Sequence, residues 1–309
     1  MLTDEVWPAY NRRLNSPPSH LLSGEELSGE QLASLLDRAQ ALKAGRAAGE
    51  GADALAGKTV GLFFELPSTR TRVSFQVAVA ELGANPLALR ADELQLGRGE
   101  SISDTARVLS RYVHAIAIRS GAHATVAELA EAAQIPVINA LTPEHHPCQA
   151  LADLLTLRER FGGLEGLVVA YVGDGNNVAR SLAILGRAAG VEVRVASPPG
   201  YELEPGLAAL DTNDAREAAA GADALYADVW VSMGDEDTAE RRRADLAPFR
   251  LDEALLDAAA PRAVVLHCLP AHPGEEITAG LLYGERSAVW DQAENRLHAQ
   301  KALLELLVD

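Results

Sequence analysis

Lysine is nearly absent from this chain: among its 309 residues only Lys43, Lys58 and Lys301 occur, beside 24 arginines. Acidic residues outnumber basic ones by 44 to 27, so the formal net charge is −17 at pH 7. Nucleic acids and anionic membranes bind basic surfaces, and this charge balance therefore argues against both as partners. Any site for a phosphate group must instead combine arginine forks with backbone amides and hydroxyl groups.

Cysteine and long apolar runs are equally scarce. The two cysteines, Cys148 and Cys268, stand in unlike contexts and form no disulfide framework, which is typical of a reducing compartment. The first ten residues hold early acids and no apolar core, so no secretory signal is expected. No apolar run approaches the ~18 residues of a membrane span. These features predict a cytoplasmic location.

Short apolar runs alternate with segments of helical periodicity, as in the βαβ units of parallel sheets. The expected strands are 59–65, 86–89, 115–120, 136–140, 166–174, 191–198, 224–230 and 261–269. The first expected helix has the start residues Ser28, Glu30 and Gln31. The other expected helices are 71–82, 103–113, 125–133, 148–161, 177–190, 215–222 and 292–307. We predict an α/β fold of two domains, each a parallel-sheet αβα sandwich, with helix 148–161 as the bridge between them.

Chemically distinctive residues lie at, or directly after, the carboxyl ends of six of the expected strands. In open parallel sheets, ligands bind beyond the carboxyl ends of the strands. The segments at these ends are PSTRTR at 67–72, Arg119, LTPEHHPCQ at 141–149, GDGNN at 173–177, DVWVSMGD at 228–235 and HCLPAH at 267–272. Their shared position predicts that they line binding sites.

The segment PSTRTR combines the residue types that bind a dianion. Ser68 or Thr69 can cap the next helix, whose first backbone amides and dipole attract negative charge. Thr71 adds a hydroxyl group, and Arg70 or Arg72 adds a planar charged fork. We therefore favour an anion site over the alternative, a capped helix with solvent-exposed arginines.

Two other phosphate-binding motifs are present only in part. The segment GADALAGKT (51–59) has one residue too many between its glycines for a P-loop, and it precedes a strand rather than a helix. The turn GDGNN (173–177) follows a strand, but Val178 stands where a dinucleotide-binding loop has its third glycine. An NAD-dependent oxidoreductase is thus a weak alternative. The amides of Asn176 and Asn177 suit a ligand that carries a carboxylate.

Histidine and cysteine occur together in HHPCQ (145–149) and HCLPAH (267–272). Neither segment has the C-x-x-C pair typical of structural zinc sites, so no metal is expected. Nothing in the sequence places Cys148 or Cys268 beside a base, and we expect these segments to polarise a carbonyl group rather than to act covalently. Asp228, directly after a strand, either pairs with an ammonium group or belongs to an acidic loop.

The ordered set STRTR, HPCQ, DGNN, DVWVSMG, HCLP and AENR resembles the ornithine branch of the carbamoyltransferase superfamily, from about residue 20 to the end. The resemblance implies a carbamoyl-phosphate-binding domain over 1–146, with 1–18 as a loose arm, and an ornithine-binding domain over 147–290. The C-terminal helix, in 291–309, would return to the first domain. The implied reaction carries the carbamoyl group to the δ-amine of L-ornithine, giving L-citrulline and phosphate for arginine biosynthesis, with neither metal nor cofactor.

The resemblance also implies roles for individual residues of this chain. Those for carbamoyl phosphate are Ser68, Thr69, Arg70, Thr71, Gln95, Arg119, His146, Gln149, Cys268, Leu269 and Arg296. The implied catalytic residues among them are Arg119, His146, Cys268 and Arg296. Those for ornithine are Asn177, Asp228, Ser232 and Met233. Gln95 matches a position that relatives lend to a neighbouring subunit, which implies a homotrimer or a multiple of trimers.

Two positions depart from many relatives of the ornithine branch: Leu66 stands where they have lysine, and Pro273 where they have arginine. The alternative acceptors are N-acetylornithine, putrescine and aspartate. Aspartate would require cationic residues around its second carboxylate, whereas this chain offers Asp228. Putrescine has no carboxylate for Asn177 to bind. An inactive relative is disfavoured because the chemical positions of the motifs are filled.

Overall fold

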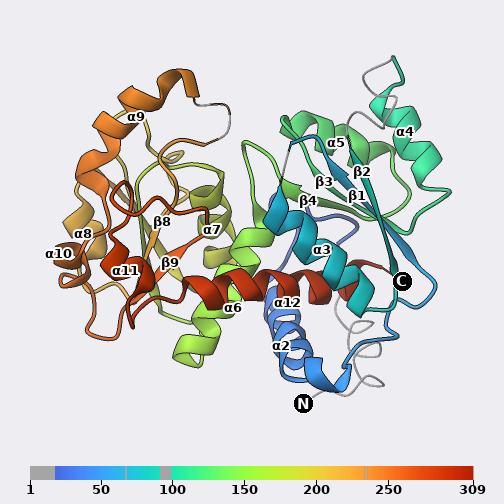
Figure 1. The fold of residues 1–309 in the computed structure, drawn as a ribbon, viewed down its shortest axis with the longest axis horizontal. Helices are drawn as coiled ribbons and strands as arrows, with labels where there is room; N and C mark the ends of the chain where they lie inside the picture. Colours follow the sequence, from blue (N-terminus) through green and yellow to red (C-terminus); the bar gives the residue numbers. More distant parts are fainter. Residues whose placement is uncertain (1–17, 67, 91–98, 233, 235, 309) are drawn as a thin grey trace. The chain divides into compact units, whose positions relative to one another are not determined.

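The structure is a computed structural model that describes residues 18–66, 68–90, 99–232, 234 and 236–308. The chain divides into two units, one formed by residues 1–151 and 296–309 and the other by residues 152–295. Each unit is built on its own parallel sheet with helices around it (Figure 1). No helix in the described ranges is long and apolar enough to cross a membrane. The predicted two-domain α/β class is confirmed.

The described strands of the first unit are parallel, in the order β2-β1-β3-β4. They are β1 (Thr59–Phe64), β2 (Asn85–Arg90), β3 (Ala115–Arg119) and β4 (Val137–Leu141). The accompanying helices are α2 (Gly29–Ala44), α3 (Thr69–Glu81), α4 (Ile102–Leu109) and α5 (His123–Ala132). All five residues of β3 are buried. A strand that is buried along its whole length is typical of a parallel sheet covered on both faces.

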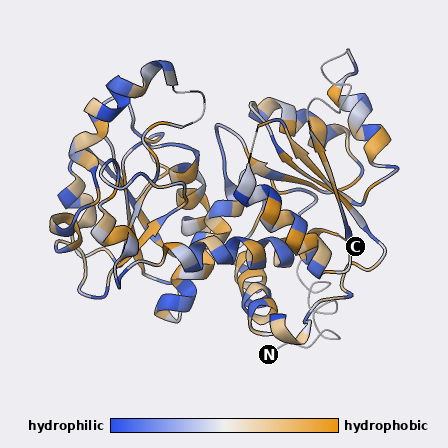
Figure 2. Cartoon of the chain, viewed as in Figure 1, coloured by the Kyte–Doolittle hydropathy of each residue, from blue (hydrophilic) through white to orange (hydrophobic). Residues whose placement is uncertain are grey.

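The second unit holds a parallel sheet with the order β7-β6-β5-β8-β9 in its described part. The strands are β5 (Val168–Val172), β6 (Glu192–Ala196), β7 (Leu210–Thr212), β8 (Ala224–Ala227) and β9 (Val264–His267). The helices are α7 (Asn177–Ala188), α8 (Ala215–Ala219), α9 (Ala239–Leu246), α10 (Glu253–Leu256) and α11 (Ala279–Tyr283). Figure 2 shows largely hydrophobic strands in the sheets and helices that alternate between hydrophobic and hydrophilic stretches.

Two long helices belong partly to each unit. α6 (Pro147–Phe161) begins in the first unit and ends in the second, whereas α12 (Val289–Leu307) begins in the second and ends in the first. Within the first unit, Arg38 Nε of α2 lies 2.6 Å from Glu305 Oε2 of α12, and the two side chains are only 3% and 4% exposed. The C-terminal helix therefore returns to the first domain, as expected.

Every predicted strand and helix has a counterpart, and most differences lie at element ends. Ser28 begins α2 through a capping box, in which Ser28 N donates to Gln31 Oε1 at 2.9 Å. α3 begins at Thr69, earlier than predicted, and α4 ends at Leu109 instead of residue 113. The strand β7 and the helices α9, α10 and α11 were not predicted, because short or highly charged segments show no apolar periodicity. The arm expected at 1–18 lies outside the described residues except for residue 18.

Candidate active site

Three of the predicted segments of the first unit lie at the carboxyl edge of its sheet. Ser68 precedes α3 after β1, Arg119 is the last residue of β3, and His146 stands between β4 and α6. These strands end at the same edge because they are parallel. Ser68 has an extended backbone, with φ −156° and ψ 101°, and its side chain forms no capping hydrogen bond. Of the two residues that the sequence offered as caps, Ser68 is the N-cap residue of α3, but its hydroxyl does not supply the cap.

Arg296 of α12 brings together residues from three helices of the first unit. Its Nη2 donates to Thr71 Oγ1 of α3 at 2.7 Å, and its Nη1 donates to Gln149 Oε1 of α6 at 3.2 Å. All three side chains are nearly buried, with Arg296 at 4%, Thr71 at 1% and Gln149 at 1% exposed. The sequence motifs that contain these residues thus meet in one place.

Three guanidinium groups act on one buried imidazole in the first unit. Burial, together with the charges of Arg296 and Arg70, lowers the pKa of Arg119 to about 10. Burial also lowers the pKa of His146 well below its ordinary value, as do the charges of Arg296, Arg119 and Arg70. We call Arg70, Arg119, Arg296 and His146 the anion cluster. It gathers positive charge in a chain whose net charge is −17, and its imidazole is neutral near pH 7.

The anion cluster distinguishes between the two arginines that the sequence left as alternatives. Both Arg70 and Arg72 are exposed in α3. Arg70 is among the charges that depress the pKa of Arg119 and of His146, and Arg72 is not. The electrostatics of the cluster therefore favour Arg70 over Arg72 as the arginine that meets an anion.

Replacing His146 with glutamine is expected to flatten the acid limb of the stability profile. The folded-state pKa of His146 lies below the ordinary value of 6.5, so below that pH the unfolded chain binds a proton that the folded chain rejects. The contribution of the neutral imidazole is thus present above about pH 6.5 and is lost as the pH falls. Denaturant unfolding between pH 6 and 5 should show wild type losing up to about 1.4 kcal/mol more per pH unit than His146→Gln. Parallel profiles would contradict a neutral, buried His146.

Cys148 has no nucleophilic role in this arrangement. Its side chain is fully buried, and its Sγ donates to the Asn139 carbonyl oxygen at 3.5 Å. Burial raises the pKa of Cys148 to about 12. A thiolate, which is the reactive form, is therefore disfavoured at neutral pH.

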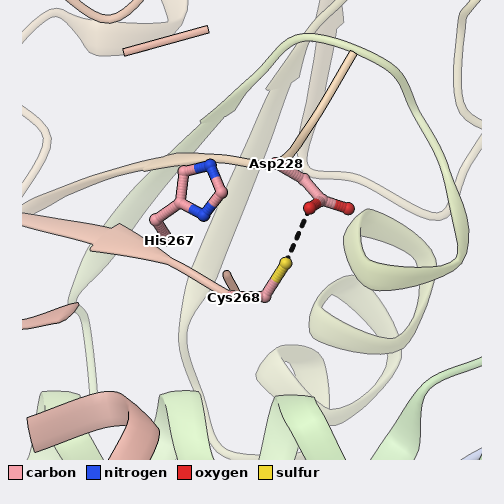
Figure 3. Close-up of side chains that lie close together, drawn as sticks. All are labelled: Asp228, His267 and Cys268. Atoms are coloured by element: carbon pink, nitrogen blue, oxygen red, sulfur yellow. Dashed lines mark hydrogen bonds between the residues drawn. The ribbon is translucent and has the colours of Figure 1, made fainter. Parts of the chain in front are cut away.

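Asp228 is the centre of a second cluster, in the second unit. It follows β8 and is 9% exposed. Its Oδ1 accepts hydrogen bonds from Cys268 Sγ at 2.7 Å and from the Val229 amide at 2.8 Å, and its Oδ2 accepts one from Asn176 Nδ2 at 2.8 Å. Figure 3 shows the Cys268 sulfur pointing at the Asp228 carboxylate. This fixed carboxylate suits an ammonium or amine group. We call Asp228, Cys268 and Asn176 the acceptor cluster.

His267 lies beside the acceptor cluster, but its ring nitrogens are engaged elsewhere. Its Nδ1 accepts from the Leu269 amide at 2.9 Å, and its Nε2 faces Glu276 Oε1 at 3.1 Å. The accepting Nδ1 makes Nε2 the donor to the carboxylate. Potential ligand atoms of Asp228, His267 and Cys268 do lie within 4.8 Å of one another. A metal there would have to displace one of these two hydrogen bonds of His267.

Asn176, in the turn before α7, contacts the protein itself rather than standing free for a ligand carboxylate, as its amide had suggested. Asn176 is the N-cap, and its Oδ1 accepts from the amides of Val178 and Ala179 and from Tyr171 OH. Its Nδ2 is engaged with Asp228. Asn176 therefore orients the Asp228 carboxylate. Asn177 is the half-buried first residue of α7, and it is better placed than Asn176 to meet a ligand.

Four further predicted residues differ in how far the structure describes them. Ser232 and Leu269 are half-buried residues of the second unit. Gln95 and Met233 lie outside the described residues.

Two contacts were not predicted from the sequence. One joins Cys268 to Asp228, which are 40 residues apart, and the other joins His267 to the buried Glu276. A carboxylate shortly after a Cys-His motif was the available signal for Glu276.

The chain has two α/β units, and each carries one cluster of side chains suited to a charged substrate. This arrangement is typical of a transferase that binds two substrates. Residues 19–159 match the carbamoyl-P binding domain of the aspartate/ornithine carbamoyltransferases, and residues 165–307 match their Asp/Orn binding domain. The chain belongs to the aspartate/ornithine carbamoyltransferase family.

Relatives of high similarity carry the name of one branch of this family. The chain is 55% identical to an ornithine carbamoyltransferase of a Parafrankia species, over 94% of this chain and 96% of the relative. It is 54% identical to that of Acidothermus cellulolyticus, over 94% and 96%. Among solved structures, the ornithine carbamoyltransferase from Pyrococcus furiosus matches with a TM-score of 0.90 and 46% identity, over 94% of this chain and 97% of that one.

Proposed function

We propose that this chain transfers the carbamoyl group of carbamoyl phosphate to the δ-amine of L-ornithine, forming L-citrulline and phosphate. The observation that carries the proposal is the anion cluster, in which Arg70, Arg119 and Arg296 converge on a neutral His146 within an acidic chain. The names of the similar proteins support ornithine as the acceptor. Formation of citrulline would place the enzyme in arginine biosynthesis, in the cytoplasm.

The donor is held by the first unit. The phosphate binds at the N-terminus of α3, where Ser68, Thr69 and Thr71 supply hydroxyl groups, backbone amides supply further donors, and Arg70 supplies a charged fork. Arg119, His146 and Gln149 bind the carbamoyl oxygen and nitrogen atoms. Positive charge around the carbonyl stabilises the oxyanion that develops during attack. Arg296, which contacts Thr71 and Gln149, positions both sets.

The acceptor is held by the second unit. Asn177 binds the α-carboxylate of ornithine, Asp228 and Ser232 bind its amino groups, and Met233 contacts its aliphatic stem. The δ-amine, with an ordinary pKa of about 10.4, must lose its ammonium proton before it attacks. Asp228 and Cys268 orient the neutral amine. Attack on the carbonyl carbon forms the new C–N bond, and the C–O bond to phosphate breaks. Phosphate leaves with the electron pair and takes up the proton that the attacking nitrogen releases.

The assembly belongs to the proposal as well. Gln95 would complete the carbamoyl phosphate site of a neighbouring subunit, so the active form is a homotrimer or a multiple of trimers. The measured mass in solution should therefore be a multiple of three times 32.7 kDa. A purely monomeric active enzyme would contradict this part.

The acceptor is tested by assaying carbamoyl transfer to ornithine, N-acetylornithine, putrescine and aspartate under the same conditions. We expect ornithine to be used at least a hundredfold more efficiently than the others, because only ornithine offers a carboxylate together with two amino groups. Turnover with aspartate alone would overturn the proposal. A nicotinamide cofactor should leave the thermal unfolding temperature unchanged, whereas an increase would favour the oxidoreductase alternative.

A further inference from the structure

The helix α9 carries three consecutive arginines with very different surroundings. The side chain of Arg241 is 81% exposed, that of Arg243 is 47% exposed, and that of Arg242 between them is 13% exposed. Arg241 pairs with Asp245 on its own helix, and Arg243 with Glu275. Arg242 is the member of the run that turns into the second unit. The sequence motifs gave no role to this segment.

Arg242 contacts three separate segments of the chain. Its Nε donates to the Trp230 carbonyl oxygen at 2.6 Å, and its Nη2 pairs with the Asp174 carboxylate. Its Cζ lies 5.1 Å from the centroid of the Tyr201 ring. The hydroxyl of Tyr201 donates in turn to Asp245 Oδ2 at 3.1 Å, one turn farther along α9. A guanidinium is suited to this set, because its rigid fork serves two acceptors while its face stacks on a ring.

Two of these segments carry the predicted ornithine-binding residues. Asp174 lies in the turn 173–176, whose Asn176 donates to Asp228 Oδ2 at 2.8 Å. Trp230 is 2% exposed and lies between Asp228 and Ser232 in the chain. The third segment supports the turn, since the Gly175 amide donates to the Tyr201 carbonyl oxygen at 2.8 Å. A Cβ at Gly175 would lie 2.6 Å from the Leu203 nitrogen, so the two segments pack too closely for a side chain.

We propose that Arg242 is a positioning residue for the amino-acid substrate. It ties the turn 173–176 to the segment 228–232, so that Asn177, Asp228 and Ser232 keep one geometry, and it acts through Asp174 and the Trp230 carbonyl. This role rests on the proposed function, because it assumes that these residues bind ornithine. It predicts that substitution of Arg242 weakens binding of ornithine but not of carbamoyl phosphate, since these contacts of Arg242 lie within the second unit.

The kinetic test compares Arg242→Gln with Arg241→Gln, its exposed neighbour on the same helix. Arg242→Gln should raise the KM for ornithine about tenfold to a hundredfold, which corresponds to the loss of one hydrogen bond to a charged group. Its KM for carbamoyl phosphate should stay within about twofold of wild type. Arg241→Gln should leave both constants within about twofold. Equal ornithine KM values in the two variants would overturn the proposal, and so would a parallel rise in both constants of Arg242→Gln.

Conservative and reciprocal variants show whether geometry or charge matters. Arg242→Lys retains the charge but not the fork, and it should recover only part of the ornithine affinity. Asp174→Asn should raise the ornithine KM as well, and the double variant with Arg242→Gln should show less than the product of the two single effects. Multiplicative effects would mean that Arg242 does not act through Asp174, which contradicts the proposed route.

Amide hydrogen exchange separates this inference from the proposed function. Without any substrate, Arg242→Gln should exchange faster than Arg241→Gln in segments 173–177 and 228–232, because these loops have lost their shared tie. Equal exchange in the two variants would overturn the positioning role. If wild type fails to use ornithine, the proposed function fails, whereas the exchange rates still decide whether Arg242 holds the two segments.

Discussion

Arg70→Ala is expected to lower kcat/KM for carbamoyl phosphate about a thousandfold while leaving the fold intact. Arg70 is exposed at the start of α3, yet its charge acts on both Arg119 and His146. Loss of a positioned cationic donor removes stabilisation that matters most when the phosphate departs, and comparable groups contribute roughly 10²–10⁵ in rate. Steady-state kinetics with carbamoyl phosphate as the varied substrate measures the loss of kcat/KM. Thermal unfolding checks that the fold is intact.

The matched control is Arg72→Ala, because Arg72 is also exposed, lies in the same helix and loses the same side chain. It is not among the charges that depress the pKa of Arg119 or His146. We expect its kcat/KM to stay within about fivefold of wild type. Near-native turnover of Arg70→Ala, or equal losses in both variants, would refute the assignment of the phosphate to Arg70.

The fold was predictable because the apolar runs and the turn residues agreed along the chain. The run at 59–65 ends in PSTRTR, and the structure places β1 and α3 there with Ser68 between them. Residues that follow parallel strands share one edge of a sheet, so strand ends alone predicted where chemically able side chains collect. Arg119 and His146 illustrate this in the first unit, and Asp228 illustrates it in the second.

Short polar elements escaped prediction for a physical reason. The helix α9 has the sequence AERRRADL, and Leu246 is its buried residue. Its position follows from contacts that individual side chains make with distant segments, such as the bond from Arg242 to Trp230. No local periodicity records such contacts. The helix α9, which we infer to position the ornithine-binding residues, could therefore not be predicted from the sequence.

The pairings within the clusters were also beyond the sequence. Arg296 and Thr71 are separated by 225 positions, and only the return of α12 to the first unit brings them to 2.7 Å. The resemblance assigned both residues to carbamoyl phosphate without relating them to each other. The lowered pKa of His146 likewise results from burial and from three arginines on different elements. Residue types were readable from motifs, whereas electrostatics required the fold.

Asp228→Asn is expected to lower kcat/KM for ornithine roughly a thousandfold, with little change in the KM for carbamoyl phosphate. The substitution removes the charge that faces the amine, and pairs of this kind contribute about 2–5 kcal/mol. It also replaces a carboxylate that accepts from Asn176 Nδ2 with an amide. The Asn176 side chain cannot rotate to adapt, because its Oδ1 already accepts hydrogen bonds from three other donors. Initial rates with each substrate varied in turn measure the two constants separately.

The control for this variant is Asp223→Asn, at the opposite end of the same strand. Asp223 is 8% exposed and Asp228 is 9% exposed, so both substitutions neutralise a carboxylate of similar burial. Asp223 pairs with Arg262 and accepts from the Val168 amide at the amino-terminal edge of the sheet. Asp223→Asn should therefore lower the unfolding temperature while keeping the ornithine constants within about twofold. If Asp223→Asn impairs ornithine use as strongly as Asp228→Asn does, the defect reflects the stability of β8, and Asp228 has no special role in binding the acceptor.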